Sequence, residues 1–255
     1  MIKFQSFLSS SSGNATYVTD DVHHFLVDCG GGCRYICECF RRIGVKPEDL
    51  TGIFITHEHR DHIAGVGILS RKYDIPVYAT EKTWQAMESV IGNIRPENKR
   101  IIDKNMVFGT LTVKSFSIPH DAAEPVGYSF ITEDDKFSVA TDMGFVTDEV
   151  LSAISGSRSV IIEANHDTDM LQNGPYPFYL KKRIAGEKGH LPNKECAKLC
   201  IQLLKTGTEA IWLGHLSAEN NKPELAYSTI MTALEQENLQ NSGVSVNVLP
   251  KQWLV

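Results

Sequence analysis

Residues 52–65 read GIFITHEHRDHIAG. The apolar start of this stretch, residues 52–56, predicts a strand, and its second half places four possible metal ligands, His57, His59, Asp61 and His62, within six residues. Alternate side chains of an extended chain share a face, so His57, His59 and Asp61 should converge while His62 follows as the chain turns. The alternative is a solvated loop. Buried imidazoles and carboxylates are costly unless they are paired or coordinated, which favours a metal site.

Such a site needs partners from distant parts of the chain, and three further residues follow predicted strands. His120 follows the alternating strand near 111–118, Asp142 follows the strand at 136–140, and His215 follows the strand at 210–213. Functional residues of layered α/β proteins tend to lie on loops at strand ends. These three residues are therefore the expected remaining ligands.

The order of these residues, His-x-His-x-Asp-His and then a lone His, a lone Asp and a lone His, resembles the metallo-β-lactamase superfamily of binuclear metallohydrolases. Within that superfamily, six stretches resemble the YycJ (WalJ) group. These are SSSSGN at 9–14, PHDA at 119–122, EPVGY at 124–128, EANHD at 163–167, GHLPN at 189–193 and HLSAEN at 215–220. The resemblance covers nearly the whole chain and implies an α/β fold, the αββα sandwich of the metallo-β-lactamase type.

The resemblance also implies two divalent metal ions, zinc or manganese with iron also compatible, because imidazole and carboxylate ligands accept all three. It assigns His57, His59 and His120 to one ion, Asp61, His62 and His215 to the other, and Asp142 as the bridge. Asp28, which closes a predicted strand, matches the superfamily's first short motif and would orient ligands through hydrogen bonds. The alternative for Asp28 is a turn residue before Gly30 and Gly31.

Two adjacent ions imply hydrolysis through a metal-bridging hydroxide, with Asp61 orienting it, and phosphodiesters suit this arrangement. His190 is the preferred general acid because it lies among flexible glycines and histidine titrates near neutral pH. The alternative is that His190 caps the helix beginning near Asn193. His166 is a second candidate that would line the pocket, with Glu163 as a structural hydrogen-bond partner.

Weaker signals concern the substrate, because a net charge of -6 gives no overall attraction to nucleic acid. Lys181, Lys182 and Arg183 follow a stretch of aromatic residues, which suits phosphate and base contacts. The alternative is an exposed basic helix whose aromatic residues fold onto the core. Ser11, Ser12 and Asn14, at a predicted hairpin tip, are expected to bind a phosphate or to form only a turn.

The resemblance to the YycJ (WalJ) group implies a phosphodiesterase or exonuclease that acts on nucleic acid, with DNA preferred over RNA. The 73-residue separation of Asp142 and His215 is too short for the large inserted domain of RNA-processing β-CASP relatives. Two alternatives stay open: a small-molecule thioester or lactone hydrolase of the same fold, and a catalytically silent nucleic-acid-binding module. A β-lactamase is disfavoured because no secretion signal is recognised.

Composition and sequence pattern indicate the number of domains, the location of the protein and the state of its cysteines. The chain has 255 residues, of which 42% are hydrophobic and 22% charged, and strands alternate with helices without a long linker, so one domain over 1–255 is expected. No segment is apolar enough to span a membrane, and the first residues read as a strand, which predicts a cytoplasmic protein. The six cysteines lack zinc-site spacing and are expected to be reduced core residues.

Overall fold

The computed structural model describes residues 1–253 and divides into two compact units. Unit 1 comprises residues 1–115 and 122–126 together with the chain from Pro250 onward. Unit 2 comprises residues 116–121 and 127–249. Each unit has its own sheet and its own apolar core. The expectation that residues 1–255 form a single domain stays a prediction.

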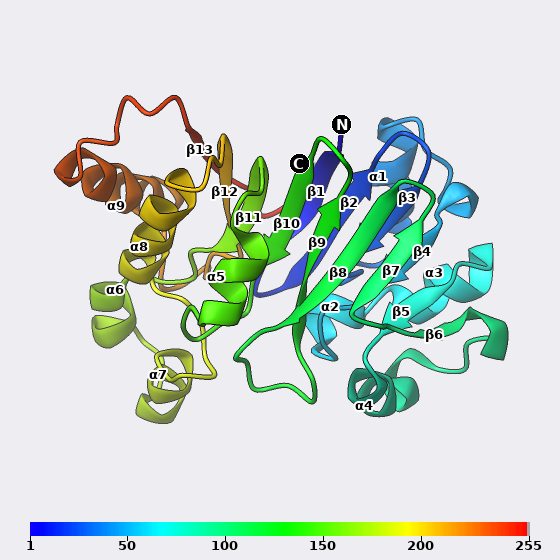
Figure 1. Ribbon diagram of the computed structural model, residues 1–255. Helices are drawn as coiled ribbons and strands as arrows, with labels where there is room; N and C mark the ends of the chain where they lie inside the picture. The colour runs from blue at the N-terminus through cyan, green and yellow to red at the C-terminus, as the bar shows by residue number, and fades with distance from the viewer. Residues whose placement is uncertain (254–255) are drawn as a thin grey trace. The chain divides into compact units, whose positions relative to one another are not determined.

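The sheet of unit 1 begins with antiparallel strands and continues with parallel ones (Figure 1). Its strands, in spatial order, are β1 (Lys3–Ser10), β2 (Gly13–Thr19), β3 (His24–Val27), β4 (Gly52–Phe54), β5 (Val77–Ala79) and β6 (Lys99–Ile101). Because β3 and β4 are parallel, Asp28 and His57 follow them at the same edge of the sheet. Strand β4 is two residues shorter than the predicted strand at 52–56.

Helices of unit 1 cover one face of this sheet. They are α1 (Cys33–Arg42), α2 (Arg60–Ile63), α3 (Val66–Tyr73) and α4 (Glu81–Ile91), with short 3-10 turns at Pro47–Asp49 and Pro96–Asn98. Alternate strand residues face opposite sides, so Leu26 and Ile53 join the core under α1 and α3. Their neighbours Phe25 and Phe54 pack instead against Phe108 of the hairpin β7 (Asn105–Phe108) and β8 (Leu111–Ser117).

Unit 2 contains a mostly parallel sheet. The first five strands of this seven-stranded sheet, in spatial order, are β13 (Ser245–Val248), β12 (Ala210–Gly214), β11 (Ser159–Glu163), β10 (Lys136–Ala140) and β9 (Val126–Ile131), and β8 and β7 follow. Strands β10, β11, β12 and β13 pair in parallel, and β9 joins β10 antiparallel. The carboxyl ends of β10, β11 and β12 therefore lie at one edge, which is where Asp142, Glu163 and His215 occur.

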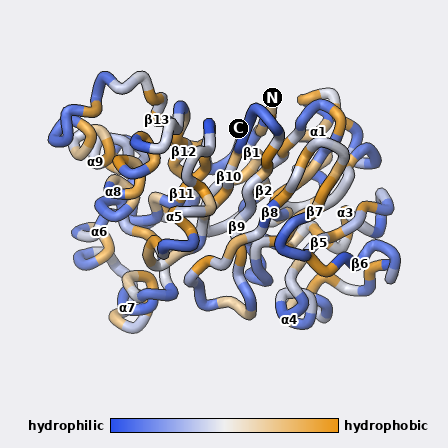
Figure 2. Tube along the Cα trace, in the orientation of Figure 1, coloured by the Kyte–Doolittle hydropathy of each residue, from blue (hydrophilic) through white to orange (hydrophobic). Residues whose placement is uncertain are grey.

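The helices of unit 2 are α5 (Asp148–Ile154), α6 (Thr168–Asn173), α7 (Phe178–Ile184), α8 (Asn193–Leu204) and α9 (Pro223–Gln236). Pro223 occupies the first turn of α9, where a missing backbone N–H costs nothing. Hydrophobic and hydrophilic residues alternate along α8 and α9 in Figure 2, and Cys200, Leu203 and Ile230 pack into the core of this unit. Within residues 1–253, none of the helices has both the length and the apolar character that crossing a bilayer requires.

Candidate metal centre

In unit 1, a buried network at the ends of β3 and β4 fixes one imidazole. Asp28 accepts hydrogen bonds from the Thr56 backbone N–H at 2.8 Å, the Thr56 hydroxyl at 2.9 Å and His62 Nδ1 at 2.8 Å. All three residues are buried. Burial raises the pKa of Asp28, although His62 and Thr56 oppose the shift. Asp28 thus makes contacts that would orient His62.

The remaining ligand candidates of unit 1 lie around His62. His57 Nε2 and His59 Nδ1 are 3.0 Å apart, and Asp61 Oδ2 lies 3.4 Å from His62 Nε2. The segment is not extended throughout, because α2 begins at Arg60, so Asp61 lies on a helical turn rather than in the predicted row with His57 and His59. Asn14 donates to His62 Nε2 at 3.0 Å.

The cluster of unit 2 is centred on Glu163, which is fully buried. Its Oε1 accepts from His190 Nδ1 at 2.8 Å and from His215 Nδ1 at 2.9 Å, while Oε2 accepts from the backbone N–H of Met143 at 2.8 Å. Burial would raise the pKa of Glu163, but the charges and hydrogen bonds of His190 and His215 outweigh it and hold the pKa far below its usual range. The sequence indicated a hydrogen-bond partner at Glu163 but not that one carboxylate serves two histidines.

Asp142 and His120 complete this cluster. Asp142 Oδ1 lies 3.4 Å from His215 Nε2 and 4.0 Å from His120 Nε2. His120 Nδ1 donates to the carbonyl oxygen of Gly189 at 3.1 Å, and burial lowers the pKa of His120. Asp142, Glu163, His190 and His215 offer ligand atoms that all lie within 4.8 Å of one another. Within unit 2, the structure therefore brings together the residues predicted there as ligands and acid.

The hydrogen bonds of these histidines suit metal ligation. His62, His120 and His215 each direct Nδ1 to an oxygen acceptor, so Nδ1 carries the proton and Nε2 is the ring nitrogen that would face a metal. A metal-binding histidine is commonly fixed in this way by a carboxylate or a carbonyl. The 3.0 Å between His57 Nε2 and His59 Nδ1 is also close to the about 3.3 Å that two nitrogen ligands of one tetrahedral ion would show. The donor sets of both units therefore fit divalent metals.

Three of the site residues have an unusual backbone conformation. Asp28, Asp142 and His215 have φ values of 59°, 62° and 54°, in the left-handed region. Aspartate and histidine tolerate this region better than branched residues, but it still costs free energy, and such strain is concentrated at functional sites. Each of the three ends its strand abruptly, which turns the side chain to the sheet edge.

His190 and His166 differ in accessibility and in partners. The side chain of His190 is partly exposed, and its ring binds Glu163, whereas Pro192 is the N-cap residue of α8 and no side chain caps it. The alternative of a capping role for His190 is therefore wrong. His166 is buried, and its Nδ1 donates to Asn165 Oδ1 at 3.3 Å, while Asn165 in turn donates to the backbone of His215. Burial lowers the pKa of His166 to about 4.

The predicted substrate-binding residues lie in different environments. Ser11 and Ser12 form the exposed tip between β1 and β2, as predicted. Asn14 does not join them: its side chain is buried, donates to Ser10 O at 3.0 Å and contacts His62, because the hairpin folds this position inward. Asn14 therefore lies beside His62 and not at the exposed tip with Ser11 and Ser12.

The basic segment forms α7, in which no residue is buried. Phe178 and Tyr179 are 80% and 74% exposed, so the alternative in which the aromatic residues fold onto the core is wrong for both. Arg183 pairs with Asp121 at 2.6 Å, and Lys181 donates to the backbone of Gln172 at 2.8 Å. Lys182 is exposed.

All six cysteines are free, in agreement with the expectation of reduced residues. Cys39 is buried on the inner face of α1 beside Ile36 and Phe40. Cys33 and Cys37 are only half-buried, with their sulfur atoms 3.8 Å apart. The three- to four-residue spacing of Cys33, Cys37 and Phe40 predicts that these residues form the buried face of α1, but the buried residues are Ile36, Cys39 and Phe40.

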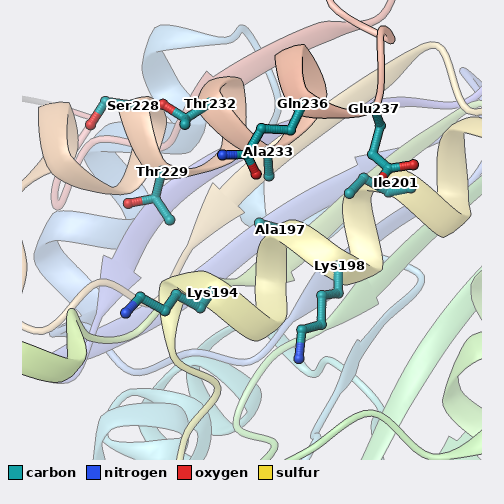
Figure 3. Close-up of a pocket in the computed structure, with 10 residues that line it drawn as sticks. All are labelled: Lys194, Ala197, Lys198, Ile201, Ser228, Thr229, Thr232, Ala233, Gln236 and Glu237. Atoms are coloured by element: carbon teal, nitrogen blue, oxygen red, sulfur yellow. The ribbon is translucent and has the colours of Figure 1, made fainter.

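A hollow of about 570 Å³ lies between α8 and α9 (Figure 3). Lys194 and Lys198 line one side of it, and Ala197 and Ile201 form part of its apolar floor. None of the ten lining residues is a histidine or one of the predicted site residues. We therefore place the chemistry at the strand-end clusters and not in this hollow.

Comparison with known proteins identifies the family of the chain. The family model described as the Beta-lactamase superfamily domain matches residues 23–215, a range that contains every predicted metal ligand. The metallo-β-lactamase fold protein YhfI from Bacillus subtilis superposes with a TM-score of 0.75 over 99% of this chain and 98% of that chain, at 15% identity. The chain belongs to the metallo-β-lactamase superfamily, and the predicted fold class, the αββα sandwich, is confirmed.

Within the superfamily, the chain is similar to named exodeoxyribonucleases over most of its length. Exodeoxyribonuclease YycJ of Bacillus anthracis is 41% identical over 92% of this chain and 90% of its own length. Exodeoxyribonuclease WalJ of Streptococcus pneumoniae is 42% identical over 96% of this chain and 91% of its own length. The predicted resemblance to the YycJ (WalJ) group is confirmed, and the protein is a metal-dependent hydrolase.

Proposed function

We propose that this protein is an exodeoxyribonuclease, a binuclear metal-dependent phosphodiesterase acting on DNA. The observation that carries the proposal is the 41% identity to a named exodeoxyribonuclease over 92% of the chain. The carboxylate-anchored histidines in both units support the same conclusion. A cytoplasmic location, where such a substrate would be reached without export, is part of this proposal.

Seven residues would hold the two ions, with Asp142 as the shared ligand. They are His57, His59, His120, Asp61, His62, His215 and Asp142. Zinc and manganese both suit this set of imidazoles and carboxylates, and iron is compatible. Bound divalent ions would supply a nucleophile at neutral pH by lowering the pKa of water, and would offset negative charge on the phosphate.

The remaining steps fall to residues of the two clusters. Asp61 would accept a hydrogen bond from the attacking water and orient it. Glu163 fixes His190 through Nδ1 at 2.8 Å, which leaves Nε2 of that ring available to donate a proton to the leaving oxygen. His190 rather than His166 takes this role because His166 is buried and turned toward Asn165.

The test is cleavage of end-labelled single- and double-stranded DNA and RNA by the purified, metal-loaded protein. We expect nucleotides to be released from one end of DNA, to stop on chelation and to resume when zinc or manganese is restored. A panel of thioesters and lactones is run in parallel. Turnover of that panel without any DNA cleavage would contradict the proposal and favour the small-molecule hydrolase.

His190→Ala separates the acid from a positioning residue. Loss of a general acid should slow DNA cleavage strongly, by roughly 10²–10⁴-fold, and should spare a nitrophenyl phosphodiester whose leaving group needs no proton. The matched control is His23→Ala, a histidine in the turn before β3 that pairs with Asp20. Equal loss with both substrates would contradict the acid role.

A further inference from the structure

Helix α7 presents two adjacent aromatic rings to solvent. Phe178 is 80% exposed and Tyr179 is 74% exposed, although large apolar side chains of this kind usually supply core packing. No residue of α7 is buried, so the helix does not contribute an apolar face to the core of unit 2. Figure 1 shows α7 as a short helix separate from the α8–α9 pair. The rings therefore require an explanation other than folding.

Positive charge lies on the same helix, one turn from the rings. Lys181 and Lys182 are three and four residues after Phe178, and Arg183 is four residues after Tyr179, so rings and cations share helix faces. The amine of Lys181 reaches the Gln172 carbonyl, and Lys182 is exposed. This local charge contrasts with a net charge of -6 for the chain. We call Phe178, Tyr179, Lys181 and Lys182 the α7 patch.

The helix is connected rigidly to the metal-centre residues of its unit. Arg183 binds the Asp121 carboxylate at 2.6 Å, and Asp121 N–H donates to Lys188 O at 3.1 Å, immediately after His120. His190 N–H donates to Ile184 O at 2.9 Å, so the last turn of α7 also holds the backbone of His190. A chain bound at the α7 patch would thus be held in a fixed relation to His120 and His190.

We propose that the α7 patch binds unpaired DNA, with bases stacked on Phe178 and Tyr179 and phosphates held by Lys181 and Lys182. The proposal rests on the proposed exonuclease function and names its substrate form, a single strand or a frayed end. Stacking needs accessible aromatic faces and tolerates any base, and adjacent cations hold the backbone. In an intact duplex the base faces are stacked on one another, so they are not accessible to the rings.

Charge favours nucleic acid over a second copy of the chain. A dimer interface built on this helix would bring the like-charged lysines of two copies together. A second copy has a net charge of -6, but it offers carboxylates and no row of phosphate groups for these lysines to bind. The phosphates of DNA complement Lys181 and Lys182 directly. Self-association nevertheless makes a different prediction and enters the test.

The test compares Phe178→Ala/Tyr179→Ala with the wild-type holoenzyme. The probe is a single-stranded oligonucleotide with phosphorothioate linkages and an internal 2-aminopurine, whose fluorescence reports stacking. We expect the Kd to rise on the order of tenfold for each ring removed, and the fluorescence change on binding to disappear. Hydrolysis of bis(p-nitrophenyl) phosphate, which cannot span the α7 patch, should stay at the wild-type rate.

Two further variants separate stacking from apolar contact and from general damage. Phe178→Leu/Tyr179→Leu keeps apolar bulk without a ring and should also lose the fluorescence change. Tyr227→Ala removes an exposed aromatic residue of α9 and should bind DNA as the wild type does.

The lysines are tested separately. Lys181→Ala/Lys182→Ala should reduce the salt dependence of single-strand binding by about 1.4 in the slope of log Kd against log salt concentration.

The outcomes distinguish this inference from the proposed function. If the wild type cleaves neither DNA nor bis(p-nitrophenyl) phosphate, the proposed function fails. If it cleaves DNA and the ring variants retain wild-type Kd and fluorescence change, the inference alone is overturned. A dimer that dissociates in the ring variants, measured by sedimentation with DNA affinity unchanged, would likewise overturn it and assign the α7 patch to self-association.

Discussion

The ligand cluster of unit 1 and that of unit 2 are built in different ways. In unit 1, the histidines come from one stretch, residues 57–62, and a single carboxylate, Asp28, orients one imidazole, His62. In unit 2, each ligand candidate comes from a different strand end or loop, and Glu163 orients two imidazoles at once. The first cluster is local in sequence, whereas the second exists only when the sheet of its unit has formed.

The two clusters share one local backbone turn. Asp28-Cys29-Gly30 and Asp142-Met143-Gly144 each place an aspartate in the left-handed region two residues before a tightly packed glycine. A Cβ at Gly30 would lie 1.6 Å from Asp61 O, and a Cβ at Gly144 would lie 2.2 Å from Glu187 O. The glycines thus admit the backbone of the segments that carry Asp61 and His190. Different clusters therefore depend on the same kind of turn.

The largest expected effect follows removal of one ligand from each cluster. His59→Ala and His215→Ala should each reduce DNA cleavage below detection, because each leaves one ion short of a ligand, while thermal unfolding without metal stays near wild type. The measurement is nucleotide release by both variants at saturating metal. Cleavage that persists in either variant would show that its cluster is not part of the site. His23→Ala serves as the matched histidine control.

A smaller effect separates the two orienting carboxylates. Loss of such a partner typically costs 10–100-fold in metal affinity or activity. Glu163 holds two histidines, whereas Asp28 holds one. We therefore expect kcat/KM to fall about 100-fold in Glu163→Gln and about tenfold in Asp28→Asn. Asp135→Asn, which removes a buried carboxylate paired with Arg158, is the control and should lower stability only. Equal losses at Asp28 and Glu163 would contradict the difference drawn between the clusters.

The smallest effect concerns the packed glycines. Gly30→Ala and Gly144→Ala should lower the free energy of unfolding by about 1–3 kcal/mol, since overpacking forces the backbone to shift. That corresponds to a Tm lower by several degrees, with the larger drop at Gly30, where the contact is shorter. Gly32→Ala, whose Cβ would have no atom within 4 Å, should unfold as the wild type does. Calorimetry on the metal-free proteins gives the comparison.

Local pattern was enough to predict much of the fold. Apolar spacing predicts helices at 33–43 and 81–91 and strands at 77–79, 136–140 and 159–163. These agree with α1, α4, β5, β10 and β11 within a residue. Each combines regular apolar spacing with a clear end signal, such as Thr80, which accepts a hydrogen bond from Thr83 N–H at the start of α4. Strands β6 and β7 were missed because their residues are mostly exposed and lack an apolar period.

The sequence indicated the ligand residues of unit 1 more fully than the hydrogen bonds of the unit 2 cluster, for a physical reason. His57, His59, Asp61 and His62 lie in one stretch, so their spacing alone indicated a metal site. The hydrogen bonds of Glu163 could not be read from sequence, because the parallel pairing of β11 with β12 sets its distance from His215. The exposure of Phe178 and Tyr179 was equally hidden, since aromatic residues on a short helix more often face a core.

The most direct test of the proposal that this chain holds a pair of divalent ions is the metal content per chain. Elemental analysis should find two ions per wild-type chain after loading with zinc or manganese, and fewer in both His59→Ala and His215→Ala. Two tightly bound ions in either variant, or a wild-type chain that is fully active with none, would contradict the account.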